Sequence, residues 1–354
     1  MPVTSRREFF AHSAAAIAMA GAVKAQPRSA EWDKRRELTL TNLQLVMGLL
    51  PTPSPREPLN IQWIGDRIRR EQHVIRRLSF ATERTKQGID RVEAYLLEPS
   101  KRQATGRLPS VLCLHATNRG KEEPAGLRPP KPQDPIDPDM HYAVHLAERG
   151  YATLAVDHPN LSGGNYTFDT YGLGYASNVM KAVWNNIRAV DLLVGLPEVD
   201  SSRIGCIGHS LGGNNALFTT VFEPRIKVAV SNCGFSSLSK TYPRTPRPHH
   251  FASQAYMPRI ESVFESNLIE IPFDFHDVIA ACAPRPILIS HAEHDPNLLV
   301  EGVPASIASA LPAYDRLGFR DKLRANYFPG GHGFPSEARA VAYDWLDKWL
   351  KGTP

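Results

Sequence analysis

The sequence has little cysteine and little net charge. Its 354 residues include four cysteines, and no two of these form a CxxC pair or another metal-like spacing. Neither a dense disulfide framework nor a cysteine-based zinc site is therefore predicted. The formal net charge of +5 falls to +3 when residues 1–25 are left out, and no long basic run with interleaved aromatics follows them. The composition thus gives no support to nucleic-acid binding.

The sequence also lacks an apolar run long enough to cross a bilayer, which takes about 20 residues. The apolar run near the N-terminus, Ala14–Val23, follows the adjacent arginines Arg6 and Arg7 and is followed by the small residue Ala25. This pattern predicts that residues 1–25 are a signal peptide, and it resembles a bacterial twin-arginine signal. The resemblance implies export by the twin-arginine machinery, a periplasmic or secreted protein, and no stable membrane anchor after cleavage. A basic, frayed N-terminal helix is the alternative.

Because an exported protein can form disulfides, the four cysteines need an interpretation. Three of them lie inside or at the end of apolar runs that are typical of strands, and the fourth just precedes such a run. We interpret all four as buried thiols, with a disulfide as the alternative. They are Cys113, Cys206, Cys233 and Cys282.

The 30 prolines predict long irregular segments. Residues 26–72 fit an N-terminal helical extension, with a helix over 29–50, followed by a stiff proline-rich connector that starts at Pro51. Residues 73–83 and 88–98 show the alternation expected of two antiparallel strands.

From residue 109 onwards, short apolar runs alternate with helix-like runs. Continuous apolar strands separated by helices predict an α/β architecture, with a mostly parallel central sheet that has helices on both faces. The antiparallel pair would extend this sheet. Two long segments, 117–138 and 234–280, interrupt the alternation, and such segments commonly form lids or substrate-binding regions. The predicted strands are 110–115, 152–157, 203–207, 227–232, 286–291 and 324–328, and the predicted helices are 139–149, 177–195, 210–221, 304–317 and 336–351.

Residues 203–213 have the pattern of a strand, a G-x-S-x-G turn and the start of a helix. Gly208 and Gly212 flank Ser210, as a tight turn requires when neighbouring side chains would clash. The Ser210 hydroxyl would then project above the sheet as a nucleophile. The N–H of Leu211 would lie at a helix N-terminus, which suits the binding of an oxyanion. A glycine-rich helix start with a capping serine is the alternative.

A serine nucleophile needs a base and an orienting carboxylate, and in this architecture the acid precedes the histidine in the chain. Asp295 follows the predicted strand 286–291 and is the expected acid. Glu293 is the second candidate, and an Asp-Pro turn is the structural alternative. His332 lies among three glycines after the last strand, where it can approach the serine, and it is the expected base. An ordinary loop histidine is the alternative.

Other residues are assigned supporting roles around the expected nucleophile. The loop after the strand that ends at His115 should supply the second oxyanion donor, the N–H of Ala116 or Thr117. His115, His209 and Tyr256 are predicted to lie at the substrate-binding site. Within that site, His115 is interpreted as orienting its loop and His209 as shaping the floor of the pocket.

Four stretches of the chain resemble the α/β-hydrolase superfamily: LCLHATNRGKEEPAG, VWNNIRAVDLL, VDSSRIGCIGHSLGG and ACAPRPILISHAEHDP. They are similar to its dienelactone-hydrolase-like and acetyl xylan esterase-like branches, and to a lesser degree to the catalytic domain of prolyl oligopeptidases. The resemblance implies an α/β-hydrolase domain over residues 73–352, with the insertion 234–280 before the acid-bearing strand. It also implies a serine hydrolase without a cofactor. True dienelactone hydrolases use a cysteine nucleophile, whereas Ser210 points to ordinary esters or amides.

We therefore predict a carboxylesterase-type serine hydrolase that works through a Ser-His-Asp triad and an acyl-enzyme intermediate. Its expected substrate is a small-molecule or saccharide-linked ester. A prolyl-oligopeptidase-like serine peptidase is the alternative, and a catalytically dead scaffold used for binding is a third possibility. No metal is predicted, because the pair His249 and His250 in the insertion has no carboxylate at helical spacing.

Overall fold

The computed structural model describes residues 30–101, 106–127, 136–241, 244 and 251–352. Within this part of the chain, nine strands form one sheet in the order β1-β2-β3-β5-β4-β6-β7-β8-β9. The predicted signal peptide and the pair His249 and His250 lie outside the described residues. The strands are β1 (Gln62–Arg69), β2 (His73–Thr85), β3 (Gly88–Pro99), β4 (Leu108–Leu114), β5 (Ala152–Val156), β6 (Val199–His209), β7 (Ile226–Asn232), β8 (Ile287–Ala292) and β9 (Leu323–Phe328).

The strands from β5 through β4 to β9 run parallel, and β1, β2 and β3 extend the sheet as an antiparallel edge. The predicted mostly parallel sheet with an antiparallel addition is thus confirmed. β1 corrects the prediction for residues 26–72, which assigned only a helix and a connector there. Its side chains are exposed or half-buried along its whole length, so it has no apolar alternation to detect. Charged residues such as Arg67 and Arg69 on an edge strand oppose pairing with another chain.

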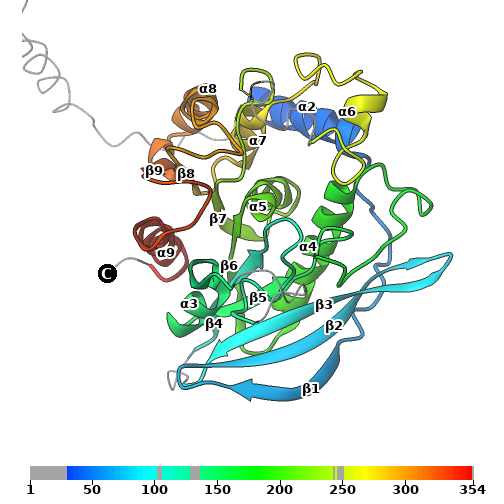
Figure 1. Cartoon of the computed structure of the whole chain (residues 1–354), viewed down its shortest axis with the longest axis vertical. Helices are drawn as coiled ribbons and strands as arrows, with labels where there is room; N and C mark the ends of the chain where they lie inside the picture. The colour runs from blue at the N-terminus through cyan, green and yellow to red at the C-terminus, as the bar shows by residue number, and fades with distance from the viewer. Residues whose placement is uncertain (1–29, 102–105, 128–135, 242–243, 245–250, 353–354) are drawn as a thin grey trace, which may run out of the picture.

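Helices cover both faces of the sheet (Figure 1). α3 and α9 pack on one face, whereas α4, α5 and α7 contribute to the apolar cluster on the other. Alternate residues of β4 point to opposite faces: Val111 and Cys113 belong to one cluster, Leu112 and Leu114 to the other. The helices are α2 (Ala30–Met47), α3 (Tyr142–Glu148), α4 (Asn178–Gly195), α5 (Leu211–Phe222), α6 (Arg259–Ser262), α7 (Phe275–Cys282), α8 (Gly302–Arg316) and α9 (Ser336–Leu350).

The N-terminal helix α2 lies against the insertion 234–280 (Figure 1). The Asn42 amide donates to the carbonyl oxygen of Pro272 in the insertion at 2.8 Å, and the Arg36 guanidinium ties α2 to α5 by donating to the carbonyl oxygen of Val221 at 2.8 Å. The insertion contains α6 and most of α7, which were not predicted. The predicted extension and the insertion thus support each other on the same face of the sheet.

Most aromatic side chains of the insertion pack into the core. The rings of Phe235 and Phe275 stack with centroids 4.6 Å apart, and Phe251 meets Phe275 edge-on at 6.2 Å. Phe273 is also buried and packs edge-on against Phe218 of α5. The insertion is therefore fixed to the body of the protein by its aromatic residues.

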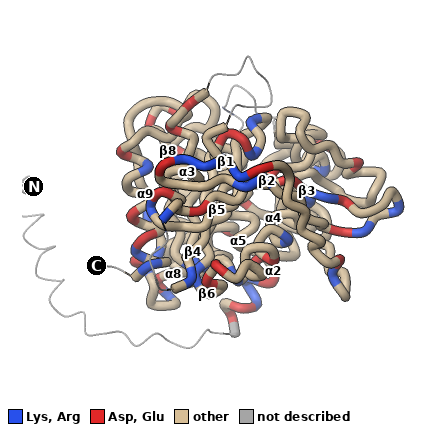
Figure 2. The backbone as a smooth tube through the Cα atoms, turned by 90° about the horizontal axis from the view of Figure 1, so that it is seen from below, with Lys and Arg blue, Asp and Glu red and all other residues tan. Residues whose placement is uncertain are grey.

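Charged residues of both signs are interspersed along the backbone (Figure 2). This distribution agrees with the small net charge of the sequence. In the described residues, no helix is both long and apolar enough to span a membrane. All four cysteines are buried and free, as predicted.

Candidate active site

Ser210 occupies the sharp turn between β6 and α5. Its backbone has φ 55° and ψ −119°, a conformation that non-glycine residues adopt rarely and that is typical of a strained nucleophile turn. The flanking glycines are required by close backbone contacts. A Cβ on Gly212 would lie 1.9 Å from the carbonyl oxygen of Leu114, and one on Gly208 would lie 2.2 Å from the carbonyl carbon of Gly212. The G-x-S-x-G spacing therefore follows from the packing of β6, α5 and β4.

Gly212→Ala is expected to disrupt this turn. Because the clash is with backbone, no side-chain movement relieves it, and we expect ester hydrolysis to fall by about 100-fold or more together with the melting temperature. Gly195→Ala is the matched control, because nothing lies within 4 Å of its Cβ position. Hydrolysis of p-nitrophenyl acetate and thermal unfolding measure both effects, and an active, stable Gly212→Ala enzyme would contradict the packing argument.

Asp295 and His332 form a hydrogen-bonded pair at the carboxyl ends of β8 and β9. His332 Nδ1 lies 2.7 Å from Asp295 Oδ2, and Asp295 Oδ1 accepts the backbone N–H groups of Asn297 and Leu298 at 2.8 and 3.0 Å. Burial alone would raise the pKa of Asp295, but these hydrogen bonds outweigh it and hold the pKa below its usual value. The carboxylate thus stays ionised and keeps the His332 proton on Nδ1, which leaves Nε2 as an acceptor. Glu293, the second candidate for the acid, is exposed.

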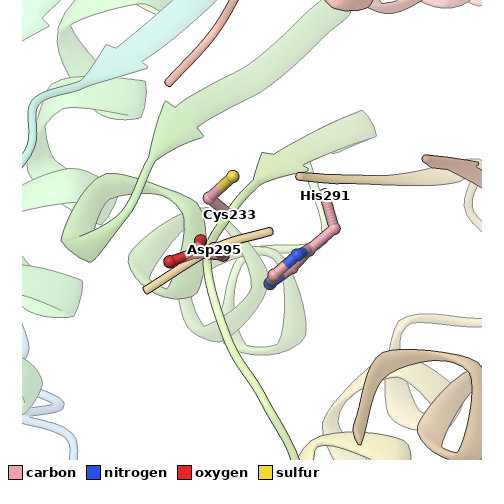
Figure 3. A group of neighbouring side chains, drawn as sticks. All are labelled: Cys233, His291 and Asp295. Atoms are coloured by element: carbon pink, nitrogen blue, oxygen red, sulfur yellow. The ribbon is translucent and has the colours of Figure 1, made fainter. Parts of the chain in front are cut away.

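Cys233 and His291 are neighbours of Asp295 (Figure 3). All three side chains are buried, and their potential metal-ligand atoms lie within 4.8 Å of one another. However, the Asp295 oxygens already accept two backbone N–H groups and the His332 ring, and His291 Nδ1 is 3.0 Å from the carbonyl oxygen of Ala292. These hydrogen bonds hold the Asp295 carboxylate in place and occupy the groups that a metal would need. The absence of a catalytic metal remains our prediction.

A cavity of about 490 Å³ opens above the Ser210 turn. It brings together Ser210 and His332 with most of the other residues that the sequence predicts for the site. The predicted residues that line it are Ala116, Thr117, His209, Ser210, Leu211, Tyr256 and His332. Tyr256 reaches it from the insertion, and its hydroxyl lies 2.7 Å from Thr117 Oγ1.

His115 corrects one prediction, because it is buried and does not line this cavity. Its Nδ1 lies 2.7 Å from the carbonyl oxygen of Ala116, and its Nε2 accepts the backbone N–H of His158 at 3.1 Å. The ring is therefore directed into the core and holds the loop that carries Ala116 and Thr117. Our interpretation of His115 as a loop-orienting residue fits these contacts, whereas a contact with substrate does not.

Buried histidines make the stability of the fold sensitive to acid. Burial lowers the pKa of His115 from 6.5 to about 4, and it also holds the pKa values of His158 and His209 well below their usual value. At a pH between the lowered pKa of the folded chain and the ordinary value of 6.5, the unfolded chain binds protons that the folded chain excludes. The free energy of unfolding therefore rises with pH in this range. We expect the free energy of unfolding to fall as pH drops from 6.5 to 4, by up to about 1.4 kcal/mol per pH unit for each histidine.

Urea unfolding at pH 7, 5.5 and 4.5 measures this loss. His158 is the best residue to replace, since neither of its ring nitrogens has a hydrogen-bond partner among the described residues. His158→Leu should therefore reduce the pH dependence of the free energy of unfolding by the contribution of one histidine. If the free energy of unfolding of this variant changed with pH as steeply as that of the wild type, the acid sensitivity would not come from buried neutral histidines.

Several residues of the site carry no signal in the sequence. Arg119, Glu123, Asn214 and Asn297 line the cavity, and Asn232 is hydrogen-bonded to His209, which also lines it. Asn214 follows Ser210 by one helical turn, and its buried Oδ1 has no hydrogen-bond partner in the described part of the chain. Only the spacing of Asn214 from Ser210 could have suggested its position. The other four residues lie in loops and at a strand end, which come together only in the folded chain.

Comparisons with known proteins connect this site to ester hydrolysis. A profile of the family described as glucuronyl esterase, fungi, matches residues 144–318. The putative hydrolase YtaP of Bacillus subtilis is 26% identical over 322 residues, which cover 86% of this chain and 96% of that protein. The 4-O-methyl-glucuronoyl methylesterase 1 of Wolfiporia cocos is 26% identical over 200 residues, 52% of this chain and 49% of that protein. This chain thus spans about half the length of that esterase.

Solved structures agree on the fold. The glucuronoyl esterase from Solibacter usitatus superimposes with a TM-score of 0.71 at 18% sequence identity, covering 91% of this chain and 94% of that one. The predicted α/β-hydrolase fold is confirmed by this likeness and by the order of the strands. Taken together, the Ser210 turn, the cavity above it and these similarities identify the chain as an α/β-hydrolase-fold carboxylic ester hydrolase.

Proposed function

We propose that the enzyme hydrolyses its ester by acyl transfer through Ser210, His332 and Asp295. The observation that carries this proposal is the hydrogen bond between Asp295 and His332. It lies at the edge of the cavity that is also lined by Ser210. His332 Nε2 takes the hydroxyl proton as Ser210 Oγ attacks the ester carbonyl carbon, and the alcohol leaves with that proton. A water molecule then releases the acid from the acyl-enzyme by the same steps in reverse.

The developing oxyanion is expected to accept two backbone N–H groups. Leu211 is the first residue of α5, so its N–H is free of helical partners and benefits from the helix dipole. The loop held by His115 supplies the second donor, from Ala116 or Thr117. Each such donor contributes on the order of 3 kcal/mol to lowering the barrier.

We propose an ester of a sugar acid as the substrate class. The cavity is about the size of a small ligand site and is lined by many polar side chains, among them Arg119, Glu123, Asn214 and Asn297. Two of the relatives described above are named glucuronoyl esterases, which supports a uronic acid as the acyl part.

Parallel assays on matched esters test this proposal. Benzyl glucuronate and benzyl acetate share a leaving alcohol and differ in the acyl group. A kcat/KM at least tenfold higher for benzyl glucuronate is expected, because only the sugar acid can use the polar lining. Equal or lower values would overturn the sugar-acid proposal while leaving ester hydrolysis intact. Cleavage of proline-containing peptides without ester hydrolysis would favour the peptidase alternative instead.

We also propose that residues 1–25 direct export and are removed, so that the mature chain begins at Gln26. It would then comprise the extension 26–72 and the hydrolase domain 73–352. Replacing both Arg6 and Arg7 by lysine should keep the esterase in the cytoplasm of a host with a twin-arginine pathway. Esterase assays on periplasmic and cytoplasmic fractions measure this, and unchanged export would contradict the twin-arginine assignment.

A further inference from the structure

Asn232, the last residue of β7, connects the nucleophile turn to the loop of the base. Its carbonyl oxygen accepts the backbone N–H of Ser210 at 2.9 Å. Its side-chain Nδ2 lies 2.8 Å from His209 Nδ1 and 2.8 Å from the carbonyl oxygen of Gly333. The residue is completely buried. One side chain thus contacts the neighbours of both Ser210 and His332.

The chemistry of these partners fixes the orientation of the Asn232 amide. The Gly333 carbonyl oxygen can only accept, so the amide nitrogen, which carries two protons, must face it. The second proton then points to His209 Nδ1, which must also accept. His209 is therefore neutral and carries its own proton on Nε2. Burial, followed by the nearby His332 ring, lowers the pKa of His209 and agrees with this state.

The tautomer matters because the two imidazole rings are neighbours. The ring centroids of His209 and His332 lie 4.7 Å apart, with an angle of 52° between the planes. In the proposed reaction His332 becomes positively charged while it holds the Ser210 proton. A neutral His209 beside it does not repel that charge, whereas a second imidazolium would.

We propose that Asn232 is a positioning residue, which sets the His332 loop against the Ser210 turn and holds His209 in the Nε2–H tautomer. This inference rests on the proposed Ser210 mechanism. Asn232 touches neither the substrate nor the reacting atoms, so its effect should appear in the chemical step and leave substrate binding largely unchanged.

Three variants separate positioning from general support of the fold. Asn232→Ala removes both donors. Asn232→Leu keeps the approximate size of the side chain but has no N–H group, so it cannot donate to Gly333 or to His209. Asn186→Ala is the control: Asn186 is equally buried and donates to Thr219 Oγ1 at 2.9 Å, but it lies in α4 and does not line the cavity.

The assay is p-nitrophenyl acetate hydrolysis at pH 8. The kcat is expressed per site that reacts to completion with diethyl p-nitrophenyl phosphate, so that misfolded enzyme is not counted. We expect both Asn232 variants to lose roughly 10- to 100-fold in kcat, with KM changed less than threefold. The rate of reaction with the phosphate triester should fall by a similar factor. Asn186→Ala should keep kcat within about twofold, even if its melting temperature falls.

Asn232→Leu with a kcat close to that of the wild type would overturn the proposal, because the size of the side chain alone would then suffice. A loss that appears only as fewer titrated sites would also overturn it, because the role would be merely structural. If Ser210→Ala retained full activity, the proposed mechanism itself would have failed, which is a different outcome from either of these.

Discussion

Ser210→Ala is expected to lower kcat/KM for p-nitrophenyl acetate by at least about 10⁴-fold. The methyl group cannot attack the carbonyl or carry the acyl group, so only binding and the oxyanion donors remain. Because Ser210 itself makes no side-chain hydrogen bond as the cap of α5, its replacement removes no such cap from the fold. The melting temperature should therefore change by no more than a few degrees.

Ser202→Ala is the matched control for this variant. Ser202 is an exposed serine of the same strand, β6, far from the nucleophile turn. It should retain full activity under the same conditions. A Ser210→Ala enzyme with more than a tenth of the wild-type activity would show that another residue attacks the ester.

Asp295→Asn is expected to lower kcat by about 10³- to 10⁴-fold, with a smaller effect on KM. An amide at this position donates to His332 Nδ1 instead of accepting from it, so the imidazole proton moves to Nε2. His332 then cannot take the proton from Ser210. The same change in the serine-protease triad, which has a corresponding histidine–aspartate pair, has an effect of about this size.

Glu293→Gln is the control for the acid. Glu293 is exposed, and its described hydrogen bond is a backbone one to Phe328. We expect this variant to keep its activity within about twofold. A large loss in Glu293→Gln together with an active Asp295→Asn enzyme would reverse the assignment of the two acids.

The parts of the site that could be predicted from sequence are those with strict local constraints. Gly208 and Gly212 follow from one tight turn, so the chain around Ser210 carries its own signature. Asp295 and His332 follow from the order of strands, because parallel strands bring their carboxyl ends to one edge of the sheet. In the structure these two residues are hydrogen-bonded, and both lie in or beside the cavity of Ser210.

The parts that could not be predicted depend on contacts between distant segments. β1 lacks an apolar pattern because it is exposed at the sheet edge, so only its pairing with β2 reveals it. Asn232 joins segments near residues 209 and 333, and no local sequence pattern predicts that these segments are in contact. His115 directly follows β4 beside the site, but its ring turns towards His158, which its position in the sequence does not show.

Covalent trapping tests the central claim most directly, because it identifies the nucleophile without reference to any natural substrate. The protein would be treated with diethyl p-nitrophenyl phosphate, which releases p-nitrophenolate as a serine oxygen bonds to phosphorus. Mass spectrometry of the digested protein would then locate the label. We predict one label per chain, on Ser210, with full loss of esterase activity and no label in Ser210→Ala. A label on another residue, or an inactivated enzyme whose Ser210 peptide is unmodified, would contradict the account.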